Sequence, residues 1–445
     1  MKYSNYNLST EISNDKLILC NLLSGAIMSL DNESYYLLQN NRTTEISSSL
    51  LDKLRTGRFL IPDSFNELNF IQNKFYYHKN RSDILSLTIL PTLDCNFDCS
   101  YCYENNRQIY MSEEITNKLI NFVARNLFAK RHFSVSWYGG EPLLAATKIW
   151  NLSKIFISMS KKIGVRYSAS MITNGSLLTP KNVEKLIEHK IERIQVTIDG
   201  PREVHNSMRY FSNRFSGNKD SYDLLLDNIS YACEYIAINV RINLGKGNYE
   251  QLEALLNSPK FNKLKDKVNI YISPILPFGT GVKVSDPNIH NICFDNSSFA
   301  EIEVNLNDKI KKAGFKFGYN FDGSECSSCR AVYLNHWVVD PVGNLLKCWD
   351  SVGDSVGYVG HISNPPKEEP MIENRKLYDW ISYNPLNNVE CKQCKFLPLC
   401  MGGCPHRVIM DNIDSKFRCI FLKFNYKEAL KRVYLESLNE GNIIN

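Results

Sequence analysis

The sequence predicts an α/β fold in which parallel strands alternate with crossover helices. From Asp83 to about residue 275, short apolar runs alternate with longer segments of helical character, and this alternation is typical of parallel sheets, open or closed. Most candidate functional motifs come directly after a predicted strand, where such folds place their active sites. A cysteine-dense C-terminal third lacks the alternation and indicates a separate unit.

The composition indicates a folded protein of several domains. The chain has 445 residues, of which 43% are hydrophobic and 22% charged, so we expect two to four domains and exclude intrinsic disorder. No apolar run approaches ~18 residues and the first ten residues are polar, so we expect neither a membrane span nor a signal peptide, and a cytoplasmic location. The net charge of +5 neither requires nor excludes a polyanionic partner.

Residues 1–82 are expected to form a first unit, an α+β module of winged-helix-like size. Two apolar runs flank Leu23-Ser24-Gly25 and predict a β-hairpin, and the polar residues that begin at Asp31 supply a helix start. The predicted elements are hairpin strands at 16–20 and 26–30, helices at 34–39 and 47–54, and a short apolar segment at 59–61.

Residues 83–320 are expected to form the βα unit, because here the two kinds of segment alternate regularly. Strands are predicted at 84–90, 133–138, 167–173, 193–198, 237–244 and 268–275. Helices are predicted at 113–127, 147–163, 181–189, 221–235 and 249–257. Residues 321–445 have fewer predicted elements, namely strands at 336–339 and 344–347 and a helix at about 426–438, so we expect bound metal to stabilise them.

The 14 cysteines are unevenly distributed, which indicates metal sites. Three lie between residues 95 and 102, and eight lie between residues 326 and 419. In a long chain without secretion signals, such clusters are more typical of metal ligands or catalytic thiols than of disulfides. The isolated Cys20, Cys233 and Cys293 are expected to be small buried hydrophobic residues.

The first cluster, Cys95, Cys99 and Cys102, forms a C-x3-C-x2-C loop directly after the first strand of the βα unit. Three closely spaced thiolates can hold three corners of a [4Fe–4S] cubane. The fourth iron would then be free to bind a small molecule, which favours a catalytic role. The alternative is a zinc site with His132 as the fourth ligand.

This loop resembles that of the radical S-adenosylmethionine (SAM) enzymes. The resemblance implies a partial (β/α)6 TIM-like barrel, in which the cluster reduces SAM to methionine and a 5′-deoxyadenosyl radical that removes a substrate hydrogen. Gly139-Gly140-Glu141-Pro142 resembles the motif that binds the SAM amino group, and Tyr101 matches the position near the adenine. Asn174 and Arg209 resemble positions that contact the ribose and the methionine carboxylate. As alternatives, the glycines and Asn174 are turn residues and Arg209 is a surface ion-pair partner.

The second cysteine region resembles the SPASM extension of these enzymes, which holds two auxiliary [4Fe–4S] clusters. The family pattern assigns Cys326, Cys329, Cys348 and Cys404 to auxiliary cluster I, and Cys391, Cys394, Cys400 and Cys419 to auxiliary cluster II. The short Cys326-x2-Cys329 spacing departs from that pattern. It leaves open that Cys326 is dispensable and that an iron is free for substrate. A zinc ribbon at residues 391–404 is the alternative.

Two carboxylates are candidates for contact with substrate. Asp350 lies two residues after Cys348, whereas sulfatase-maturing relatives carry a proton-accepting Asp immediately after that cysteine and Trp349 intervenes here. Asp350 is therefore the candidate catalytic base, with a solvated loop carboxylate as the alternative. Asp199 is a candidate substrate contact or a turn residue.

Residues 1–82 also resemble the peptide-recognition element of enzymes that modify ribosomally made peptides, which pairs a leader peptide with a sheet edge. A structural cap on the barrel is the alternative. The resemblance implies a precursor peptide as substrate, three [4Fe–4S] clusters, SAM, and a reductant such as flavodoxin or ferredoxin. Neither a nucleic acid nor a membrane is expected as a partner.

Three functions of different classes follow. The first is a peptide maturase that forms a cross-link, mainly a thioether from a cysteine sulfur to carbon, with a C–C bond or an epimerised centre left open. The second is a sulfatase-type maturase that oxidises Cys or Ser to formylglycine, which the leader-binding unit and the displaced Asp350 disfavour. The third is a non-enzymatic zinc protein that binds peptide or nucleic acid through pairs such as Lys161-Lys162 and Lys311-Lys312, although such pairs are typical of solvated helix faces.

Overall fold

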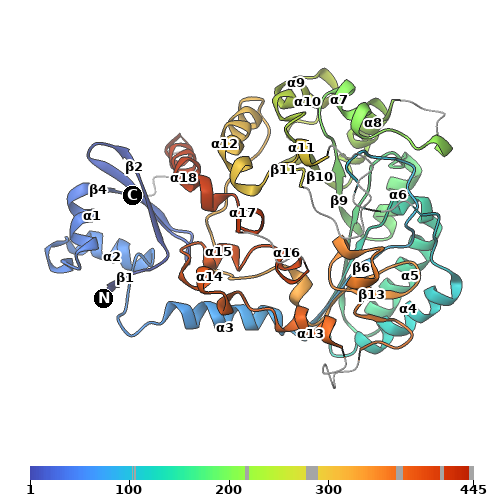
Figure 1. The fold of residues 1–445 in the computed structure, drawn as a ribbon, viewed down its shortest axis with the longest axis horizontal. Helices are drawn as coiled ribbons and strands as arrows, with labels where there is room; N and C mark the ends of the chain where they lie inside the picture. Colours follow the sequence, from blue (N-terminus) through green and yellow to red (C-terminus); the bar gives the residue numbers. More distant parts are fainter. Residues whose placement is uncertain are drawn as a thin grey trace.

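A mostly parallel sheet organises the computed structural model, which describes residues 1–102, 104, 107–215, 220–276, 289–366, 374–410 and 415–439 (Figure 1). Strands β6 to β11 follow one another across the sheet in chain order, and each pairs in parallel with the next. They cover Ile84–Ile89, His132–Trp137, Arg166–Ile172, Ile191–Thr197, Ala237–Leu244 and Val268–Pro274. Parallel strands in sequential order, joined by helices, confirm the predicted α/β core.

The connecting helices begin where capping residues provide acceptors for free backbone N–H groups. Ser112 accepts from the N–H of Ile115 at the start of α4, and Thr179 accepts from the N–H of Asn182 at the start of α6, where Pro180 is the first residue. Such caps satisfy donors that have no partner within the helix. The helices between the strands are α4 (Glu113–Asn126), α5 (Ala146–Lys162), α6 (Pro180–Glu188), α7 (Arg202–Met208), α8 (Ser221–Ala232), α9 (Leu252–Leu256) and α10 (Pro259–Asn262).

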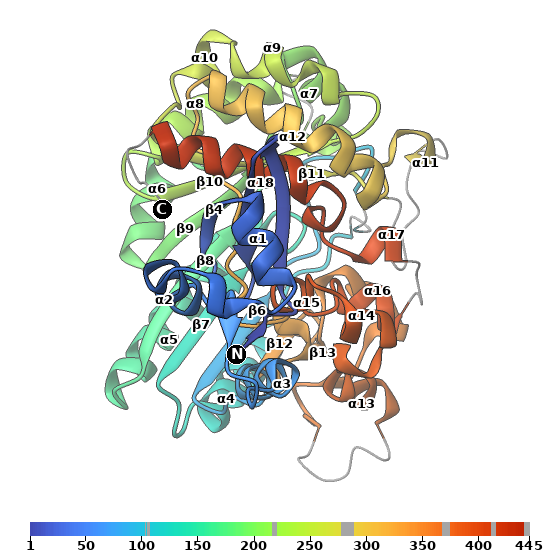
Figure 2. The same cartoon turned by 90° about the vertical axis from the view of Figure 1, so that its left-hand side faces the viewer.

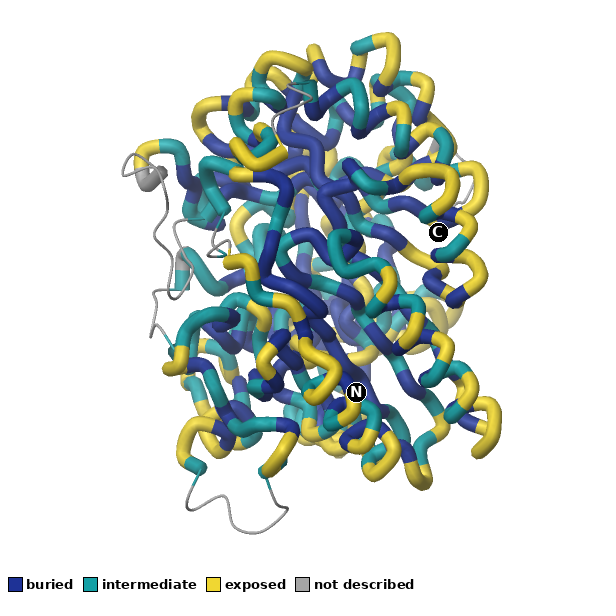
Figure 3. Tube along the Cα trace, turned by 90° about the vertical axis from the view of Figure 1, so that its right-hand side faces the viewer, coloured by how far each residue is buried: buried dark blue, intermediate teal, exposed yellow. Residues whose placement is uncertain are grey.

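The two faces of the parallel sheet differ in polarity. In β7 the residues Phe133, Val135 and Trp137 are fully buried, whereas the intervening Ser134 and Ser136 are only half-buried. The apolar face packs against helices, as the edge-to-face contact of Phe133 with Phe156 of α5 at 5.3 Å shows. Because successive side chains point to opposite faces, the other face of β7 is polar and less covered. The same alternation recurs in β8, β10 and β11, and Figure 3 shows the buried strands inside an exposed outer layer.

The C-terminal third extends this sheet at its β6 edge. Strand β12 (His336–Val339) pairs in parallel with β6, and β13 (Asn344–Leu346) and β14 (Gly360–His361) follow in antiparallel order. The sequence predicts β12 and β13 but not their place beside β6. This region is also more regular than expected, since it contains the short helices α13 (Arg375–Ser382), α14 (Val389–Gln393), α15 (Leu397–Cys400), α16 (Pro405–Ile409) and α17 (Ser415–Arg418).

The N-terminal region forms a separate three-stranded antiparallel sheet, ordered β2-β3-β4. Strands β3 (Lys16–Asn21) and β4 (Ile27–Asp31) are the predicted hairpin, and α1 (Asn32–Gln39) and α2 (Ser48–Thr56) confirm the two predicted helices. The sequence does not predict β2 (Asn7–Ser13), the pair β1 (Lys2–Tyr3) with β5 (Leu60–Ile61), or α3 (Glu67–Lys79). Helix α3 gives a weak pattern because its interior combines aromatic residues with Asn, Gln and His.

Long helices connect the N-terminal sheet to the rest of the chain. Helix α12 (Asn296–Lys312), which the sequence does not predict, packs against α18 (Leu422–Asn439), and α18 also contacts β2 and β3 (Figure 2). Lys79, at the end of α3, is buried and donates a hydrogen bond to the carbonyl oxygen of Tyr383 at 2.6 Å. Among the helices in the described ranges, none has the length and apolarity needed to cross a membrane.

The difference between the two faces predicts that truncating a side chain on the apolar face lowers the stability much more than truncating one on the polar face. Replacing the fully buried Ile242 of β10 with Ala should lower the free energy of unfolding by about 2–5 kcal/mol, because it leaves a cavity in the core. Replacing Ser134 on the polar face of β7 with Ala should change it by less than about 0.5 kcal/mol. Urea denaturation followed by circular dichroism measures both, and equal effects would contradict this description of the two faces.

Candidate functional site

The loop of Cys95, Cys99 and Cys102 lies at the C-terminal end of β6. The end of α7 and the residues after it hold the loop by backbone hydrogen bonds. The Asp98 N–H donates to the Tyr210 carbonyl at 2.9 Å, and the Ser100 N–H donates to the carbonyl of Met208, the last residue of α7, at 3.0 Å. Burial raises the pKa of all three thiols above their ordinary value. Metal ligation requires thiolates, so a bound cation would have to compensate for that cost.

Gly139 and Gly140 lie directly against the backbone of this loop. A Cβ atom on Gly139 would lie 2.4 Å from the Thr92 carbonyl oxygen, and one on Gly140 would lie 2.3 Å from the Asp94 carbonyl oxygen. Gly139 also has a φ of +135°, which favours glycine. The two glycines are therefore needed for close contact between the end of β7 and the cysteine loop, and they are more than turn residues.

Glu141 is fully buried and joins the ends of β7 and β8. Its carboxylate accepts hydrogen bonds from the N–H of Leu143 at 3.0 Å, the hydroxyl of Thr173 at 2.8 Å and the N–H of Asn174 at 2.8 Å. Burial raises the pKa of Glu141 to about 7, although these donors oppose the shift. All the hydrogen bonds observed for this carboxylate are internal, so in this structure Glu141 acts on the architecture of the site.

Asn174 braces the cysteine loop from the end of β8. Its side-chain amide donates to the Asn96 side-chain oxygen at 2.7 Å and lies 3.7 Å from the sulfur of Cys95. Asn96 in turn donates to the hydroxyl of Ser176 at 2.8 Å. The structure therefore places Asn174 beside the predicted cluster and gives it a larger role than that of a turn residue.

A buried polar network surrounds Tyr101 on the other side of the loop. The Tyr101 hydroxyl donates to the Asp199 carboxylate at 2.5 Å, and it accepts from Arg209 at 2.7 Å and from Asn243 at 3.0 Å. Burial raises the pKa of Tyr101 and of Asp199. Although burial opposes a charge on Arg209, the neighbouring Cys99, Tyr101 and Asp199 hold its pKa well above the ordinary value.

Two polar atoms in this network have no protein partner within the described residues. They are Oδ1 of Asp199 and Nε of Arg209, and both are buried. Buried polar atoms are normally satisfied, so the pair indicates a place for a polar ligand beside the cysteine loop. The sequence leaves Asp199 ambiguous and does not single out Asn243. The position of Asn243 near the end of β10, at the same edge of the sheet, was the available signal.

The C-terminal cysteines form two groups, within each of which neighbouring thiols raise one another's pKa. Burial, and then the charges of Asp350, Cys329 and Cys404, raises the pKa of Cys348. Burial, and then the neighbouring thiols Cys419, Cys391 and Cys394, raises the pKa of Cys400 to about 11. A cavity of about 300 Å³ at the end of β11 is lined by Cys404 from the first group and by Cys400 and Cys419 from the second. Within the described ranges, no three His, Cys, Asp or Glu side chains converge on a single metal ion.

The surroundings of Cys326 differ from those of Cys329, Cys348 and Cys404. It is buried, and its S–H donates to the Gly323 carbonyl at 3.3 Å. Burial raises the pKa of Cys326 to about 12, and the charged neighbours that modify this shift are Lys74, Glu325 and Asp322 rather than other cysteines. The Gly323 N–H donates to the Leu22 carbonyl at 2.9 Å, which holds the segment against the N-terminal region.

Asp350 is half-buried and lies near the first of these two groups. It also influences Glu104, a buried carboxyl two residues after Cys102 whose pKa burial raises to about 8. A hydrogen bond between Glu104 and Tyr138 opposes this rise, whereas the charge of Asp350 adds to it. Two carboxyl groups therefore lie between the cysteine loop and the Cys348 group. The sequence interpretation identified only Asp350.

The part of the chain that contains the cysteine loop and the residues around it resembles known proteins. Residues 89–258 match the Radical SAM superfamily. The cysteine-type anaerobic sulfatase-maturating enzyme of Clostridium perfringens is 24% identical over 386 residues, which are 81% of this chain and 99% of that enzyme. The radical SAM cyclopropyl synthase TigE of Paramaledivibacter caminithermalis is 21% identical over 438 residues, 88% of this chain and 83% of TigE. Streptococcus suis SuiB bound to the precursor peptide SuiA shares the fold with a TM-score of 0.50, at 16% identity, over 94% of this chain and 98% of SuiB.

The contact beneath the cysteine loop predicts the effect of a single methyl group. Gly140→Ala should displace the Asp94 carbonyl and with it the loop, and a displacement of about 1 Å can lower a rate about 100-fold. The production of 5′-deoxyadenosine from SAM measures this effect. Gly318→Ala is the matched control, because a Cβ there meets nothing within 4 Å, and an equal loss in both variants would contradict the prediction.

The network around Tyr101 predicts a loss of stability without its hydroxyl. Tyr101→Phe leaves Asp199 and Arg209 buried with fewer partners, so the free energy of unfolding should fall by about 1–3 kcal/mol. Guanidinium denaturation of this variant and of Tyr378→Phe, the same change at an exposed position, provides the comparison. Equal stability of Tyr101→Phe and the parent protein would show that the network contributes nothing.

Proposed function

We propose that this radical SAM enzyme, identified by its domain at residues 89–258, matures a ribosomally synthesised precursor peptide by joining a cysteine sulfur to carbon as a thioether. The observation that carries the proposal is a three-cysteine loop held against Gly139 and Gly140, beside the unpaired Asp199 and Arg209 atoms. The curated relatives support a peptide or protein substrate, because they include a sulfatase-maturating enzyme and TigE. SuiB, which has been crystallised with its precursor peptide, shares the fold.

The residues of the loop fit a [4Fe–4S] cluster with SAM. Cys95, Cys99 and Cys102 would hold the cluster, and SAM would complete it at the remaining iron. When bound, the pair would supply the one-electron chemistry that removes a hydrogen atom from substrate. Tyr101 and Arg209 would bind SAM on one side of the loop and Gly139-Gly140 on the other. Glu141 and Asn174 would position these groups through the bonds that join β7, β8 and the loop.

We assign the C-terminal cysteines to two auxiliary [4Fe–4S] clusters. Cys391, Cys394, Cys400 and Cys419 would hold auxiliary cluster II. Cys329, Cys348 and Cys404 would hold auxiliary cluster I. The predicted fourth ligand, Cys326, would have to give up its hydrogen bond to the Gly323 carbonyl to join them. If it does not join them, one iron of auxiliary cluster I is open to a substrate group.

The N-terminal sheet offers an edge for a leader peptide. In the described residues β4 pairs with β3 on one side and with no strand on the other. An extended peptide can add to such an edge through main-chain hydrogen bonds. Helix α18 contacts β2 and β3 and packs against α12. A leader peptide paired with β4 would therefore be held on a sheet that α18 and α12 connect to the rest of the chain.

Thioether formation requires an acceptor for a second electron. The peptide loses one S–H and one C–H bond and gains one S–C bond, so two electrons and two protons leave it. The hydrogen atom taken by the SAM-derived radical accounts for one electron and one proton. An auxiliary cluster would take the second electron, and the thiol proton would pass to a base such as Asp350. A reduced flavodoxin or ferredoxin would supply the electron that begins each turnover.

A sulfatase-type maturase is the second candidate, because the Clostridium perfringens enzyme aligns over 99% of its length. The charge of Asp350 contributes to the raised pKa of Cys348, Cys329 and Cys404. A base beside auxiliary cluster I would lie close to these three cysteines. However, Trp349 separates Asp350 from Cys348 in sequence. The extra N-terminal sheet is also more useful for a leader peptide than for a folded sulfatase.

Mass spectrometry of a co-expressed precursor peptide separates the candidate products. A thioether loses two hydrogens, retains sulfur and no longer reacts with iodoacetamide. A C–C bond also loses two hydrogens but leaves the thiol reactive. Formylglycine made from Cys loses the sulfur, and an epimer keeps its mass. A thiol-reactive product or the loss of sulfur would overturn the thioether assignment.

The assignment of the catalytic cluster predicts a selective loss. The triple variant in which Cys95, Cys99 and Cys102 are replaced with Ala should make no 5′-deoxyadenosine. It should retain about eight of about twelve irons per chain, since the auxiliary clusters have other ligands. Iron analysis after anaerobic purification and chromatography of the SAM products measure both. Continued 5′-deoxyadenosine production would exclude this loop as the catalytic site.

The separate position of Cys326 predicts unequal effects for two cysteine variants. Cys348→Ala should lose about four irons per chain, because it removes a ligand of auxiliary cluster I. Cys326→Ala should keep its iron, because its sulfur contacts the Gly323 carbonyl instead. Iron content together with Mössbauer spectra decides between them. Loss of four irons from Cys326→Ala would place this cysteine in the cluster.

A further inference from the structure

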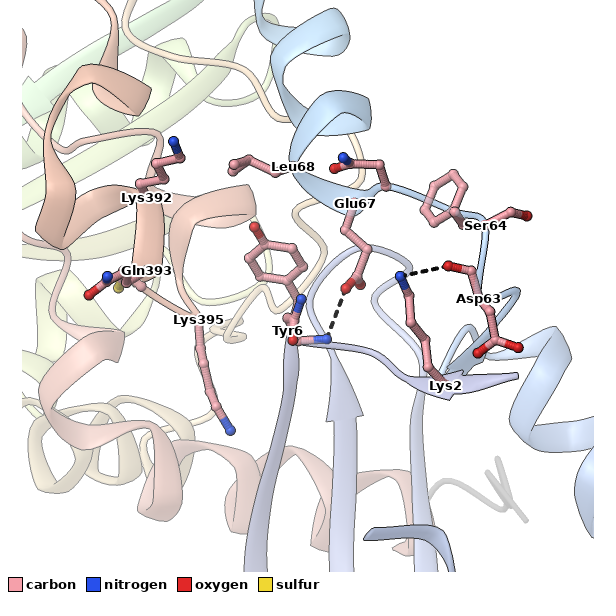
Figure 4. Close-up of a pocket in the computed structure, with 13 residues that line it drawn as sticks. Lys2, Tyr6, Asp63, Ser64, Glu67, Leu68, Lys392, Gln393 and Lys395 are labelled. Carbon is pink, nitrogen blue, oxygen red and sulfur yellow. Dashed lines mark hydrogen bonds between the residues drawn. The ribbon is translucent and has the colours of Figure 1, made fainter. Parts of the chain in front are cut away.

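A hollow of about 630 Å³ lies between the N-terminal region and α14, and we call it the basic hollow (Figure 4). Its lining comes from the beginning of the chain, from the start of α3 and from the end of α14. Figure 4 shows Lys392 and Lys395 on one side, Lys2 on the other and Tyr6 between them. Asp63, Glu67 and Cys394 also line the hollow.

The charge available at the basic hollow is positive. None of the lysines Lys2, Lys392 and Lys395 forms an ion pair with a carboxylate in the part of the chain that the structure describes; Lys2 and Lys395 donate instead to the backbone carbonyls of Asp63 and Asn7. The two carboxylates of the lining already have partners. Asp63 accepts from the Met1 amino group at 2.7 Å, while Glu67 is buried and accepts from Ser4 and Asn5.

The wall of the basic hollow contains Cys394, a proposed ligand of auxiliary cluster II. Tyr6, from the N-terminal region, lines the same hollow as Cys394. Lys423 donates to the sulfur of Cys419, another proposed ligand of that cluster, at 3.4 Å. The lysines of the hollow therefore lie beside one proposed cluster ligand, Cys394, and a further ammonium group contacts a second.

We propose that the basic hollow is the docking site of a small acidic electron-transfer protein, a flavin or iron–sulfur carrier, which reduces auxiliary cluster II. The proposal rests on the proposed function, because auxiliary cluster II is part of it. The carrier loses one electron, the cluster gains it, and no bond forms or breaks. Lysines on such a surface accelerate association with an acidic partner and make it sensitive to salt.

The position of the basic hollow favours a redox partner over an acidic leader peptide. A leader gains affinity from main-chain hydrogen bonds along a strand edge, and the open edge of β4 belongs to another part of the N-terminal sheet. The basic hollow instead presents long, flexible ammonium groups around a cluster ligand. That arrangement suits a transient complex held by charge.

Stopped-flow spectroscopy tests the proposal on the full-length holoenzyme. Bleaching of the cluster absorbance is followed after mixing with reduced flavodoxin, and in parallel with dithionite, at two salt concentrations. In the double variant Lys392→Glu, Lys395→Glu, the flavodoxin rate constant at low salt should fall by about tenfold or more, with a weaker salt dependence. The dithionite rate is the reference. The control is Lys161→Glu, Lys162→Glu, the same charge change at two exposed lysines at the end of α5.

The outcomes are distinct. A loss confined to flavodoxin and to the hollow variant supports the proposal. An unchanged flavodoxin rate constant overturns the proposal. If the variant in addition binds the precursor peptide more weakly, the hollow is assigned to the leader peptide instead. If the double variant loses iron, the flavodoxin rate constant of Lys2→Glu is measured instead and read in the same way. Lys2 is remote in sequence from every predicted cluster ligand. Failure of the cluster assignment on which this proposal rests would appear as an absence of cluster absorbance in every protein, including the parent, whereas failure of the thioether assignment would appear only in the mass of the peptide product.

Discussion

The close contact between Gly139-Gly140 and the cysteine loop is the constraint on which the rest of the site depends. The carbonyl oxygens of Thr92 and Asp94 occupy the space where side chains would otherwise begin, so the loop after β6 lies directly on the turn after β7. Glu141 then joins the ends of β7 and β8 through three backbone and side-chain donors. Three neighbouring strand ends are thereby fixed relative to one another, and a loop that is irregular in sequence obtains a defined geometry.

The division of the sheet into an apolar and a polar face gives this geometry a function. Residues such as Phe133 and Ile242 direct the helices to one side of the sheet. The opposite face carries Ser134, Ser136 and Arg241, which remain partly exposed. This face is therefore less covered than the apolar one. The C-terminal third extends the sheet through β12, and Trp349, next to Cys348, contacts Tyr138 after the end of β7 with 5.8 Å between the ring centroids.

The N-terminal and C-terminal regions depend on each other in this architecture. Helix α18 comes last in the described chain and yet packs on β2 and β3 near its beginning. Lys79 and Tyr383 form a second connection over a long sequence separation. The basic hollow lies between the same two regions and takes its lysines from both of them. These connections fix the N-terminal sheet relative to the C-terminal cysteines.

The sequence by itself determined the order of strands and main helices from β6 to β11, because each depends on local periodicity and capping. Strands β6 to β11, the hairpin of β3 and β4, and the cysteine loop follow from residues that are neighbours in the chain. Only the tertiary structure decided which distant residues meet. Tyr101 joins Asp199, Arg209 and Asn243 across about 100 residues or more, and β12 joins β6 across about 250. Cys326 is three residues from Cys329, yet its sulfur lies in a different environment, because the Gly323 backbone is bound to Leu22. Spacing alone contains no information about such long-range hydrogen bonds and packing.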